Sequence, residues 1–190
     1  HGADFVCDGD FGSTGKGKLC AWLASRQRYA WTTSSNGSQA GHTAESREGD
    51  GSFVMTQQIP IAYALGLVQR GVIGPAAILD LDVLRKEFEK FKVDPTFFSV
   101  HPNAAVISEA HKVREAEVTN RIASTMKGNG ACLADKVLRH PDLKRAQDVG
   151  WLQPYVRDDL GSVRASASGA VSAVPGPVLV EMSQGFNLDL

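Results

Sequence analysis

Cysteine is scarce in this chain of 190 residues, which contains only Cys7, Cys20 and Cys132. The three lie far apart in sequence and form neither a Cys-x-x-Cys pair nor the ligand spacing of a zinc site. This pattern argues against a disulfide framework and against a cysteine-ligated metal. We therefore expect buried free thiols in a protein of a reducing compartment.

The sequence also lacks an excess of either charge and a long apolar run. Its 20 Lys and Arg residues nearly balance 21 Asp and Glu residues, so we expect no surface built for nucleic acid. No apolar run approaches the length of a membrane span, and the N-terminus has no signal-peptide layout. We expect a cytoplasmic protein without a membrane partner. Because the first residue is His1 rather than methionine, we also expect that the true start is missing.

Short apolar segments alternate with helical patterns, which is typical of an α/β fold. We predict one domain over 1–190, with a mainly parallel central sheet flanked by helices. Small residues dominate 161–177, which has the composition of a linker or of a region that has lost a segment. Polar turn residues predict loops at 34–43 and 124–131, and the charges of 82–91 indicate a solvated helix surface. The predicted strands are 4–7, 30–33, 52–57, 76–80, 96–100, 104–107 and 178–182, and the predicted helices are 16–29, 82–91, 132–140 and one capped by Ser108 that runs towards Arg121.

Residues 7–18, CDGDFGSTGKGK, place four glycines and two lysines between a predicted strand and a predicted helix. Glycine-rich backbone and positive charge at a helix start are typical of an anion site. The common triphosphate-binding loop does not fit, because five residues rather than four separate Gly9 from Gly15, and Gly17 replaces the hydroxyl residue after Lys16. The dinucleotide pattern fails as well, since Cys20 replaces its third glycine. Composition alone fits a phosphate site and a solvated surface turn about equally well.

A second loop, QAGHT at 39–43, favours the phosphate site. GSTGKGK followed by QAGHT resembles the GDEGKGK and NAGHT motifs of adenylosuccinate synthetase. Later stretches resemble the same family in the same order, and the weakest likeness lies over 151–174. These stretches are AAILDLDVLRKEFE, IASTMKGNGACLADKVLR (similar to IGTTxRGIGPAYADKVxR) and VLVEMSQGFNLDL (similar to VLFEGAQGTLLDID).

The resemblance implies a ligase of purine biosynthesis that joins L-aspartate to the 6-position of a purine nucleotide. The family first transfers a phosphoryl group from GTP to the 6-oxygen, and the aspartate amine then displaces the phosphate. A base must remove the N1 proton, while a proton donor and Mg²⁺ offset charge on the transferring group. The implied partners are a purine nucleoside monophosphate, a nucleoside triphosphate, L-aspartate and a second subunit.

The motif match implies a catalytic set of Ser13, Lys16, His42 and Gln184. His42 resembles the general acid that contacts the phosphoryl group, and Gln184 resembles the glutamine that stabilises the 6-oxyanion. Lys16 resembles a phosphate ligand. Ser13 and the carbonyl of Gly41 occupy the positions of magnesium ligands.

The nucleotide-binding set extends over three motifs. Ser124 and Thr125 match hydroxyls that hold the nucleotide 5′-phosphate, and Arg139 matches an arginine that reaches this phosphate in the partner subunit of a homodimer. Lys127 and Asn129 replace the family's arginine and isoleucine in this segment. The other implied nucleotide-binding residues are Gly12, Thr14, Gly15, Gly17, Lys18, Gln39, Ala40, Gly41 and Thr43.

Ser13 is the main departure from the family, because it replaces the aspartate that acts as the base. Thr14 replaces the glutamate that follows. A serine is not a base at neutral pH without help. One interpretation is a noncatalytic relative. The other is a changed substrate, since a small hydroxyl leaves room for the 2-amino group of guanine and can pair with it.

The second interpretation resembles a viral branch of the family, the 2-aminoadenylosuccinate synthetases, which use deoxyguanylate to supply 2-aminoadenine for phage DNA. Asp10 is the local candidate for the missing base. The other interpretation is that Asp10 only forms part of a turn. Three functions stay open, in this order: a dGMP-directed ligase using ATP, dATP or GTP, an adenylosuccinate synthetase acting on IMP with GTP, and a nucleotide-binding relative without ligase activity.

Family members are longer than this chain. Their segments that bind aspartate and the base of the triphosphate follow the equivalent of Leu190. We therefore expect an N-terminal portion or an incomplete sequence that does not catalyse the full ligation alone. A viral protein of this kind acts in the host cytoplasm.

Overall fold

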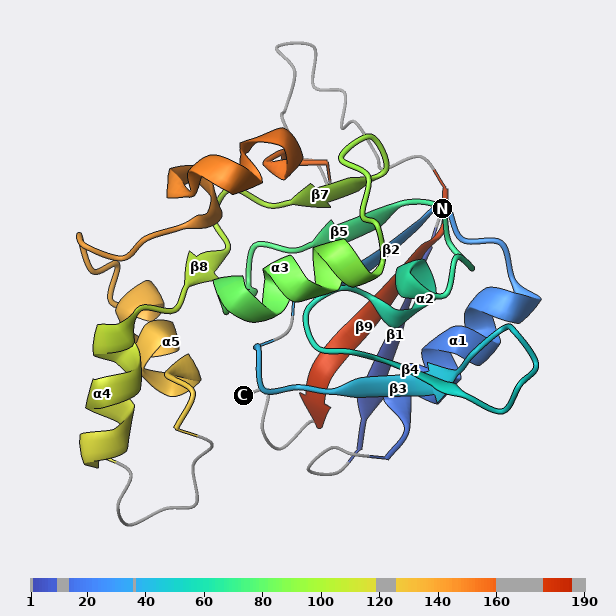
Figure 1. Cartoon of the computed structure of the whole chain (residues 1–190), viewed down its shortest axis with the longest axis horizontal. Coiled ribbons are helices and arrows are strands. Elements are labelled where there is room, and N and C mark those ends of the chain that lie inside the picture. Colours follow the sequence, from blue (N-terminus) through green and yellow to red (C-terminus); the bar gives the residue numbers. More distant parts are fainter. Residues whose placement is uncertain (1, 10–13, 36, 119–125, 160–175, 186–190) are drawn as a thin grey trace.

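Five parallel strands form the sheet that organises the chain (Figure 1). This computed structural model describes residues 2–9, 14–35, 37–118, 126–159 and 176–185. The strand order is β1-β9-β2-β5-β7, and every neighbouring pair is parallel. The mainly parallel α/β fold predicted from the sequence is therefore confirmed. The strands are β1 (Ala3–Asp8), β2 (Trp31–Ser34), β5 (Gly71–Ile73), β7 (Phe98–Val100) and β9 (Val178–Gly185).

Strand β9, the latest in sequence, lies inside the sheet between β1 and β2 (Figure 1). Val178 pairs with Ala3 on one side and with Trp31 on the other. Residues two apart in a strand point to the same face. Leu179 and Glu181 therefore share a face, and both are buried. A carboxylate in the buried part of a central strand requires polar partners.

Helices and two small sheets surround the central sheet (Figure 1). The pair β3–β4 is an antiparallel hairpin, and β6–β8 is a short parallel pair. In Figure 1, α4 and α5 lie side by side at the end of the molecule away from α1. The bounds are α1 (Lys16–Arg26), α2 (Ile61–Ala64), α3 (Leu81–Lys90), α4 (Glu109–Val118), α5 (Asn129–Val137), β3 (His42–Glu45), β4 (Phe53–Thr56), β6 (Ile78–Leu79), β8 (Ala105–Val106) and the 3₁₀ helices η1 (Ala146–Asp148) and η2 (Gly150–Tyr155).

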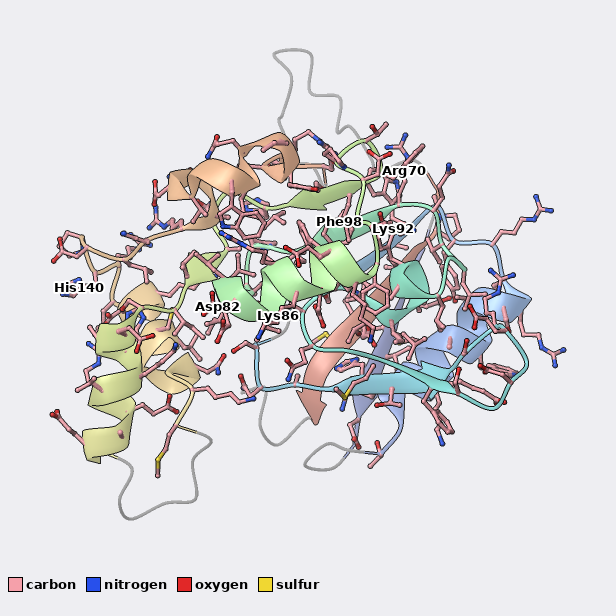
Figure 2. The ribbon with its side chains drawn as sticks, viewed as in Figure 1. Arg70, Asp82, Lys86, Lys92, Phe98 and His140 are labelled. Carbon is pink, nitrogen blue, oxygen red and sulfur yellow. The ribbon has the colours of Figure 1, made fainter. Side chains whose placement is uncertain are left out.

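Helix α3 shows how the apolar core is assembled. Its Phe88 packs edge-on against Phe98 of β7, with ring centroids 5.4 Å apart, and its Leu84 is fully buried. Phe98 is labelled beside α3 in Figure 2, whereas Asp82 and Lys86 of the same helix are exposed. Apolar residues spaced three and four apart give the helix one face for the sheet and one for solvent.

Several predicted elements differ from the structure. The helix predicted over 16–29 ends at Arg26, where Gln27 takes an extended conformation. The loop predicted over 34–43 contains the end of β2 and the start of β3, because His42 pairs with Thr56 across the hairpin. Helix α5 begins inside the predicted loop 124–131 and ends before 140. Such long-range pairings have no local signal in the sequence.

Other features went unpredicted. Helix α2, strand β5 and both 3₁₀ helices have only three to six residues each, which is too short to show a periodic pattern. Among the cysteines, Cys20 and Cys132 are buried free thiols as expected, but Cys7 is exposed because it points away from the core face of β1. Most of the segment 161–177 lies outside the described residues, and Pro177 accepts a hydrogen bond from the backbone of Ala30 (2.9 Å).

Glu87 contradicts the expectation that the charged run 82–91 is wholly solvated. It is buried, and its carboxylate accepts backbone N–H groups from three successive residues, Gln57, Gln58 and Ile59. Burial raises the pKa of Glu87 above its ordinary value, although these three donors oppose the shift. The carboxylate thus holds the chain between β4 and α2 against α3.

Replacing Glu87 by alanine is expected to lower the free energy of unfolding by about 3 kcal/mol, because it leaves buried N–H groups without an acceptor. Urea denaturation of the complete gene product measures this. Glu89→Ala, an exposed change on the same helix, is the matched control and should cost less than about 0.5 kcal/mol. Equal losses in the two variants would contradict a structural role for the Glu87 carboxylate.

Candidate functional site

The candidate site lies where β1 ends and α1 begins. Asp8 is the last residue of β1, and Lys16 is the first residue of α1; both are buried. Their charged groups are 3.5 Å apart, from Lys16 Nζ to Asp8 Oδ2. The hydroxyl of Thr14 also donates a hydrogen bond to Asp8. The carboxylate therefore orients the lysine that the motif match assigns to phosphate binding.

The start of α1 is suited to bind an anion. Gly15 precedes it with φ 95°, a left-handed conformation that favours glycine. Among the described residues, no side chain caps this end of the helix, and its first turn contains no acidic residue. The first N–H groups of a helix carry partial positive charge and need acceptors. A phosphate at this position would supply them.

Gly17 allows α1 to pack directly on β3. A Cβ atom at this position would lie 2.8 Å from both the backbone nitrogen and the backbone oxygen of Thr43. Contacts this short with rigid backbone do not occur in folded proteins. Gly17, the second glycine of 15–18 (GKGK), is therefore required for this packing. The packing places α1, which contains Lys16, directly beside β3, which contains His42.

His42 and Glu181 form a buried pair in which Nδ1 of the histidine contacts Oε1 of the carboxylate. The other oxygen of Glu181, Oε2, accepts the backbone N–H of Ile61 (2.8 Å). Nε2 of His42 is buried and has no hydrogen-bond partner within the part of the chain that the structure describes. Because Nδ1 faces Glu181, Nε2 is the nitrogen left to act on a ligand.

The sequence analysis missed Asp8 and Glu181. Each had a signal, because Asp8 directly follows an apolar strand, and Glu181 interrupts the apolar run VLVEM. Lys16 lies eight positions after Asp8, and His42 lies 139 positions before Glu181. Neither pairing could be predicted without the tertiary structure. Burial and the charge of Glu181 also raise the pKa of Cys20 well above its usual range, which keeps that thiol protonated on the buried side of α1.

The residues of the QAGHT loop have different exposures. Ala40 and His42 are buried, Gln39 is half-buried, and Gly41 and Thr43 are exposed. Lys18 is exposed on the outer face of α1, with its Nζ 5.9 Å from the ring centroid of Phe53, and it lines a hollow of about 650 Å³ between α1 and the β3–β4 hairpin. Their roles in nucleotide binding stay predictions.

Several predicted residues lie outside what the structure describes. These are Gly12, Ser13, Ser124 and Thr125, together with the candidate base Asp10 and the side chain of Gln184 in β9. Arg139 is described: it is exposed just after α5, with φ 55°. Its predicted contact with a partner subunit stays a prediction.

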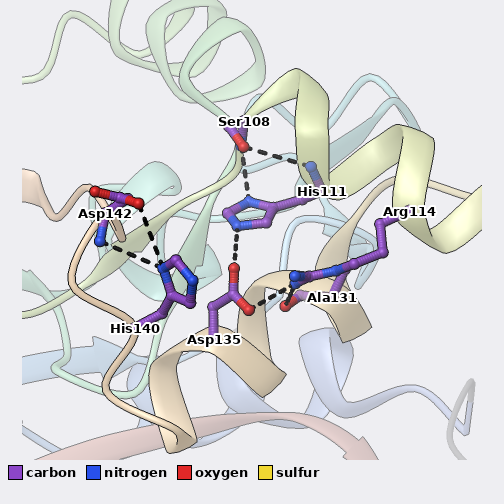
Figure 3. A network of polar contacts seen from close by, with 7 residues as sticks. All are labelled: Ser108, His111, Arg114, Ala131, Asp135, His140 and Asp142. Atoms are coloured by element: carbon purple, nitrogen blue, oxygen red, sulfur yellow. Dashed lines mark hydrogen bonds and ion pairs between the residues drawn. The ribbon is translucent and has the colours of Figure 1, made fainter.

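Helices α4 and α5 are joined by a polar network (Figure 3). Nδ1 of His111 accepts the backbone N–H of Ser108 (3.0 Å), so its Nε2 carries the hydrogen that it shares with Asp135 (3.0 Å). Arg114 donates to the same carboxylate (2.8 Å) and thereby lowers the pKa of Asp135. Ser108 also accepts a weak bond from the His111 N–H (3.4 Å), as its predicted capping role requires.

No group of three or more His, Cys, Asp or Glu side chains close enough to hold a metal occurs among the described residues. Mg²⁺ prefers oxygen ligands and commonly keeps waters and substrate phosphates. Gly41 fits this, because it is exposed and a Cβ there would meet nothing within 4 Å, so its backbone is open to approach. In the described part of the chain, no helix is long and apolar enough to span a membrane.

A parallel α/β sheet, a buried lysine at the start of the helix that follows β1, and a buried histidine paired with a carboxylate are features typical of a phosphate-binding α/β protein. The comparisons with known proteins then identify the family. The model of adenylosuccinate synthetase matches residues 5–157, and the chain therefore belongs to this family.

Phage enzymes are among its relatives. The chain is 30% identical to the N6-succino-2-amino-2′-deoxyadenylate synthase of Vibrio phage phiVC8 over 98% of its length and 55% of that relative. It is 32% identical to the synthase of the same name from Salmonella phage PMBT28, over 99% of the chain and 54% of the relative. An adenylosuccinate synthetase of Methanococcus aeolicus is 26% identical over 97% of the chain and 54% of the relative. The chain thus spans about half the length of these relatives.

Solved structures share the fold. The succinoaminodeoxyadenylate synthetase of cyanophage S-2L, solved with dGMP and with dATP as an energy donor, superposes with a TM-score of 0.77 at 24% identity, over 97% of this chain and 52% of that one. The fully ligated adenylosuccinate synthetase of Plasmodium falciparum gives a TM-score of 0.72 at 15% identity, over 97% of this chain and 51% of that one. At these identities the likeness concerns the fold.

Proposed function

We propose that this chain is part of a ligase that joins L-aspartate to the 6-position of dGMP, giving 2-amino-N6-succino-dAMP. The observation that carries the proposal is Ser13 at the position of the family's aspartate, in a chain that keeps Lys16 and His42 buried and paired. A relative that had lost its chemistry would have no reason to keep both pairs. The names of the two phage relatives support the same substrate.

The described residues are suited to the first half-reaction, in which the 6-oxygen bonds to the γ-phosphorus of the triphosphate, the bond to the bridging oxygen breaks, and the nucleoside diphosphate leaves. Lys16, held by Asp8, and the N–H groups at the start of α1 bind phosphate oxygens and offset their charge. With its Nδ1–H directed at Glu181, the doubly protonated ring of His42 donates a hydrogen bond from Nε2 to the transferring group. Magnesium, held through Gly41 and Ser13, supplies further positive charge for the phosphates when it is bound.

In the second half-reaction the aspartate amine attacks C6, the C6–O bond breaks, and the phosphate leaves with the bonding electrons. In the first half-reaction, before the phosphoryl transfer, Gln184 stabilises the 6-oxygen while it carries negative charge. The hydroxyl of Ser13 pairs with the 2-amino group of guanine. Asp10 is the candidate to take the N1 proton, and the donor is ATP, dATP or GTP.

Assembly and location follow from the same proposal. Ser124 and Thr125 bind the 5′-phosphate of the monophosphate, and Arg139 completes that site in the partner subunit of a homodimer. The exposure of Arg139 supports this role, since it is free to reach a neighbouring subunit. The place of action is the cytoplasm of a phage-infected host.

The complete gene product, incubated with aspartate, Mg²⁺ and ATP, dATP or GTP, is expected to release phosphate and form a succinylated nucleotide with dGMP and not with IMP. Mass spectrometry of the nucleotide, together with phosphate release, measures this. Product from IMP alone would overturn the proposal in favour of an ordinary adenylosuccinate synthetase with Asp10 as base. Nucleotide binding without any product would leave a binding protein.

A further inference from the structure

Thr56 lies directly opposite His42 in the β3–β4 hairpin. Side chains that face each other in an antiparallel pair point to the same side, with Cβ atoms about 4.5–5.5 Å apart. Both are deeply buried, with 1% of Thr56 and 3% of His42 exposed. The hydroxyl of Thr56 is buried and, like Nε2 of His42, has no hydrogen-bond partner within the residues that the structure describes. These two polar atoms belong to neighbouring side chains on one face of the hairpin.

The face of the hairpin that carries these atoms changes from apolar to polar along its length. The neighbouring pair on the same face is Ala44 opposite Val54, and both pack into the apolar cluster with Cys20 beneath α1. The pair of His42 and Thr56 follows at the open end of the hairpin. Burying a hydroxyl without a partner is costly, so most buried hydroxyls are hydrogen-bonded. A bound ligand at this end would supply the missing acceptor.

Both strands of the hairpin are held in place at this end. Helix α1 packs on β3, since a Cβ at Gly17 would lie 2.8 Å from backbone atoms of Thr43. Strand β4 is fixed just after Thr56, because the carboxylate of Glu87 accepts the backbone N–H groups of the next three residues. Donors held by rigid elements stabilise developing charge without the cost of reorganisation. The hydroxyl of Thr56 has this kind of support.

We propose that Thr56 donates a second hydrogen bond, beside that of His42, to the phosphoryl group transferred from the triphosphate. This inference rests on the proposed function, because it takes His42 as the residue that contacts this group. The oxygens of a transferring phosphoryl group carry negative charge and accept several donors at once. Gly41, directly before His42, is exposed, which leaves this end of the hairpin open to a ligand.

Thr56→Val in the complete gene product removes the hydroxyl and keeps the shape of the side chain. It is expected to lower kcat with dGMP, aspartate, Mg²⁺ and the triphosphate about 30-fold. Thr56→Ser keeps a hydroxyl and should recover kcat to within about threefold of the wild type. Because the ligand-free protein loses no hydrogen bond, Tm of Thr56→Val should equal or exceed that of the wild type. A lower Tm would show that the hydroxyl is structural and would overturn the proposal.

Thr32→Val is the matched control. Thr32 in β2 is as deeply buried as Thr56, and its hydroxyl also has no partner in the described part of the chain. Thr32 pairs with Leu179 and with Gly71 rather than with a residue of the site. Thr32→Val should therefore keep kcat within about twofold of the wild type, with Tm equal or higher. Equal losses of kcat in the two valine variants would contradict a specific role for Thr56.

Calorimetry with ATP, dATP and GTP tests the hydroxyl separately from ligation, because the corresponding diphosphates lack the group that is transferred. Thr56→Val should raise Kd for the triphosphate that binds about tenfold, and Kd for its diphosphate less than about twofold. Unchanged Kd values would overturn the role of Thr56 even if the wild type forms 2-amino-N6-succino-dAMP. A selective rise for the triphosphate, in a protein that forms no succinylated nucleotide, would support this role and reject the ligase.

Discussion

Replacing Glu181 by glutamine in the complete gene product is expected to lower kcat by about 100-fold, with KM for the nucleotides changed little. The carboxylate accepts two donors at once, the ring nitrogen of His42 and the backbone N–H of Ile61. An amide has one acceptor oxygen, so its NH₂ group must face one of the two. If it faces His42, the ring takes the opposite tautomer or turns. If it faces Ile61, a buried N–H loses its partner.

The readout for Glu181→Gln is kcat per mole of folded protein, with circular dichroism and urea denaturation to measure stability. Glu87→Ala is the control, because it removes another buried carboxylate that binds backbone N–H groups but does not contact His42. Glu87→Ala should lose stability and keep kcat. A kcat for Glu181→Gln within about twofold of the wild type would restrict Glu181 to a structural role.

Replacing Gly17 by alanine is expected to lower kcat/KM by at least about 100-fold and to destabilise the fold, because the added methyl group cannot fit. Its Cβ would lie 2.8 Å from two backbone atoms of Thr43 and 3.2 Å from the carbonyl carbon of His42. Backbone atoms of a paired strand do not move as the end of a side chain does. Helix α1 must then shift away from β3, which separates Lys16 from His42.

Gly150→Ala is the matched control for Gly17→Ala, since a Cβ at Gly150 would meet nothing within 4 Å. Both variants replace a helical glycine, and alanine is favoured over glycine in helices. Steady-state kinetics and thermal denaturation of both proteins separate the steric effect from the helical preference. Equal behaviour of the two variants would contradict the packing argument.

The sequence by itself determined the class of the fold. Alternation of apolar segments with helical patterns predicted a parallel α/β sheet, and the glycine loop taken together with QAGHT indicated an anion site at the start of α1, which stays a prediction. These signals are local, because strand and helix periodicity and glycine preference act over a few residues. The resemblance of the ordered motifs to adenylosuccinate synthetase supplied the family, and the family model bears it out.

The tertiary structure alone decided the partners of those residues. Asp8 beside Lys16 and Glu181 beside His42 join segments of β1, α1, β3 and β9, and the last pair spans 139 positions of sequence. The insertion of β9 between β1 and β2 creates the pair of Glu181 and His42. The periodicity of the sequence does not predict which strand lies between the others in the sheet. The hydrogen bond from the Ser38 N–H to the side chain of Asn129, which joins residues 91 positions apart, has the same origin. A buried polar group requires a partner, but only the folded chain determines which residue provides it.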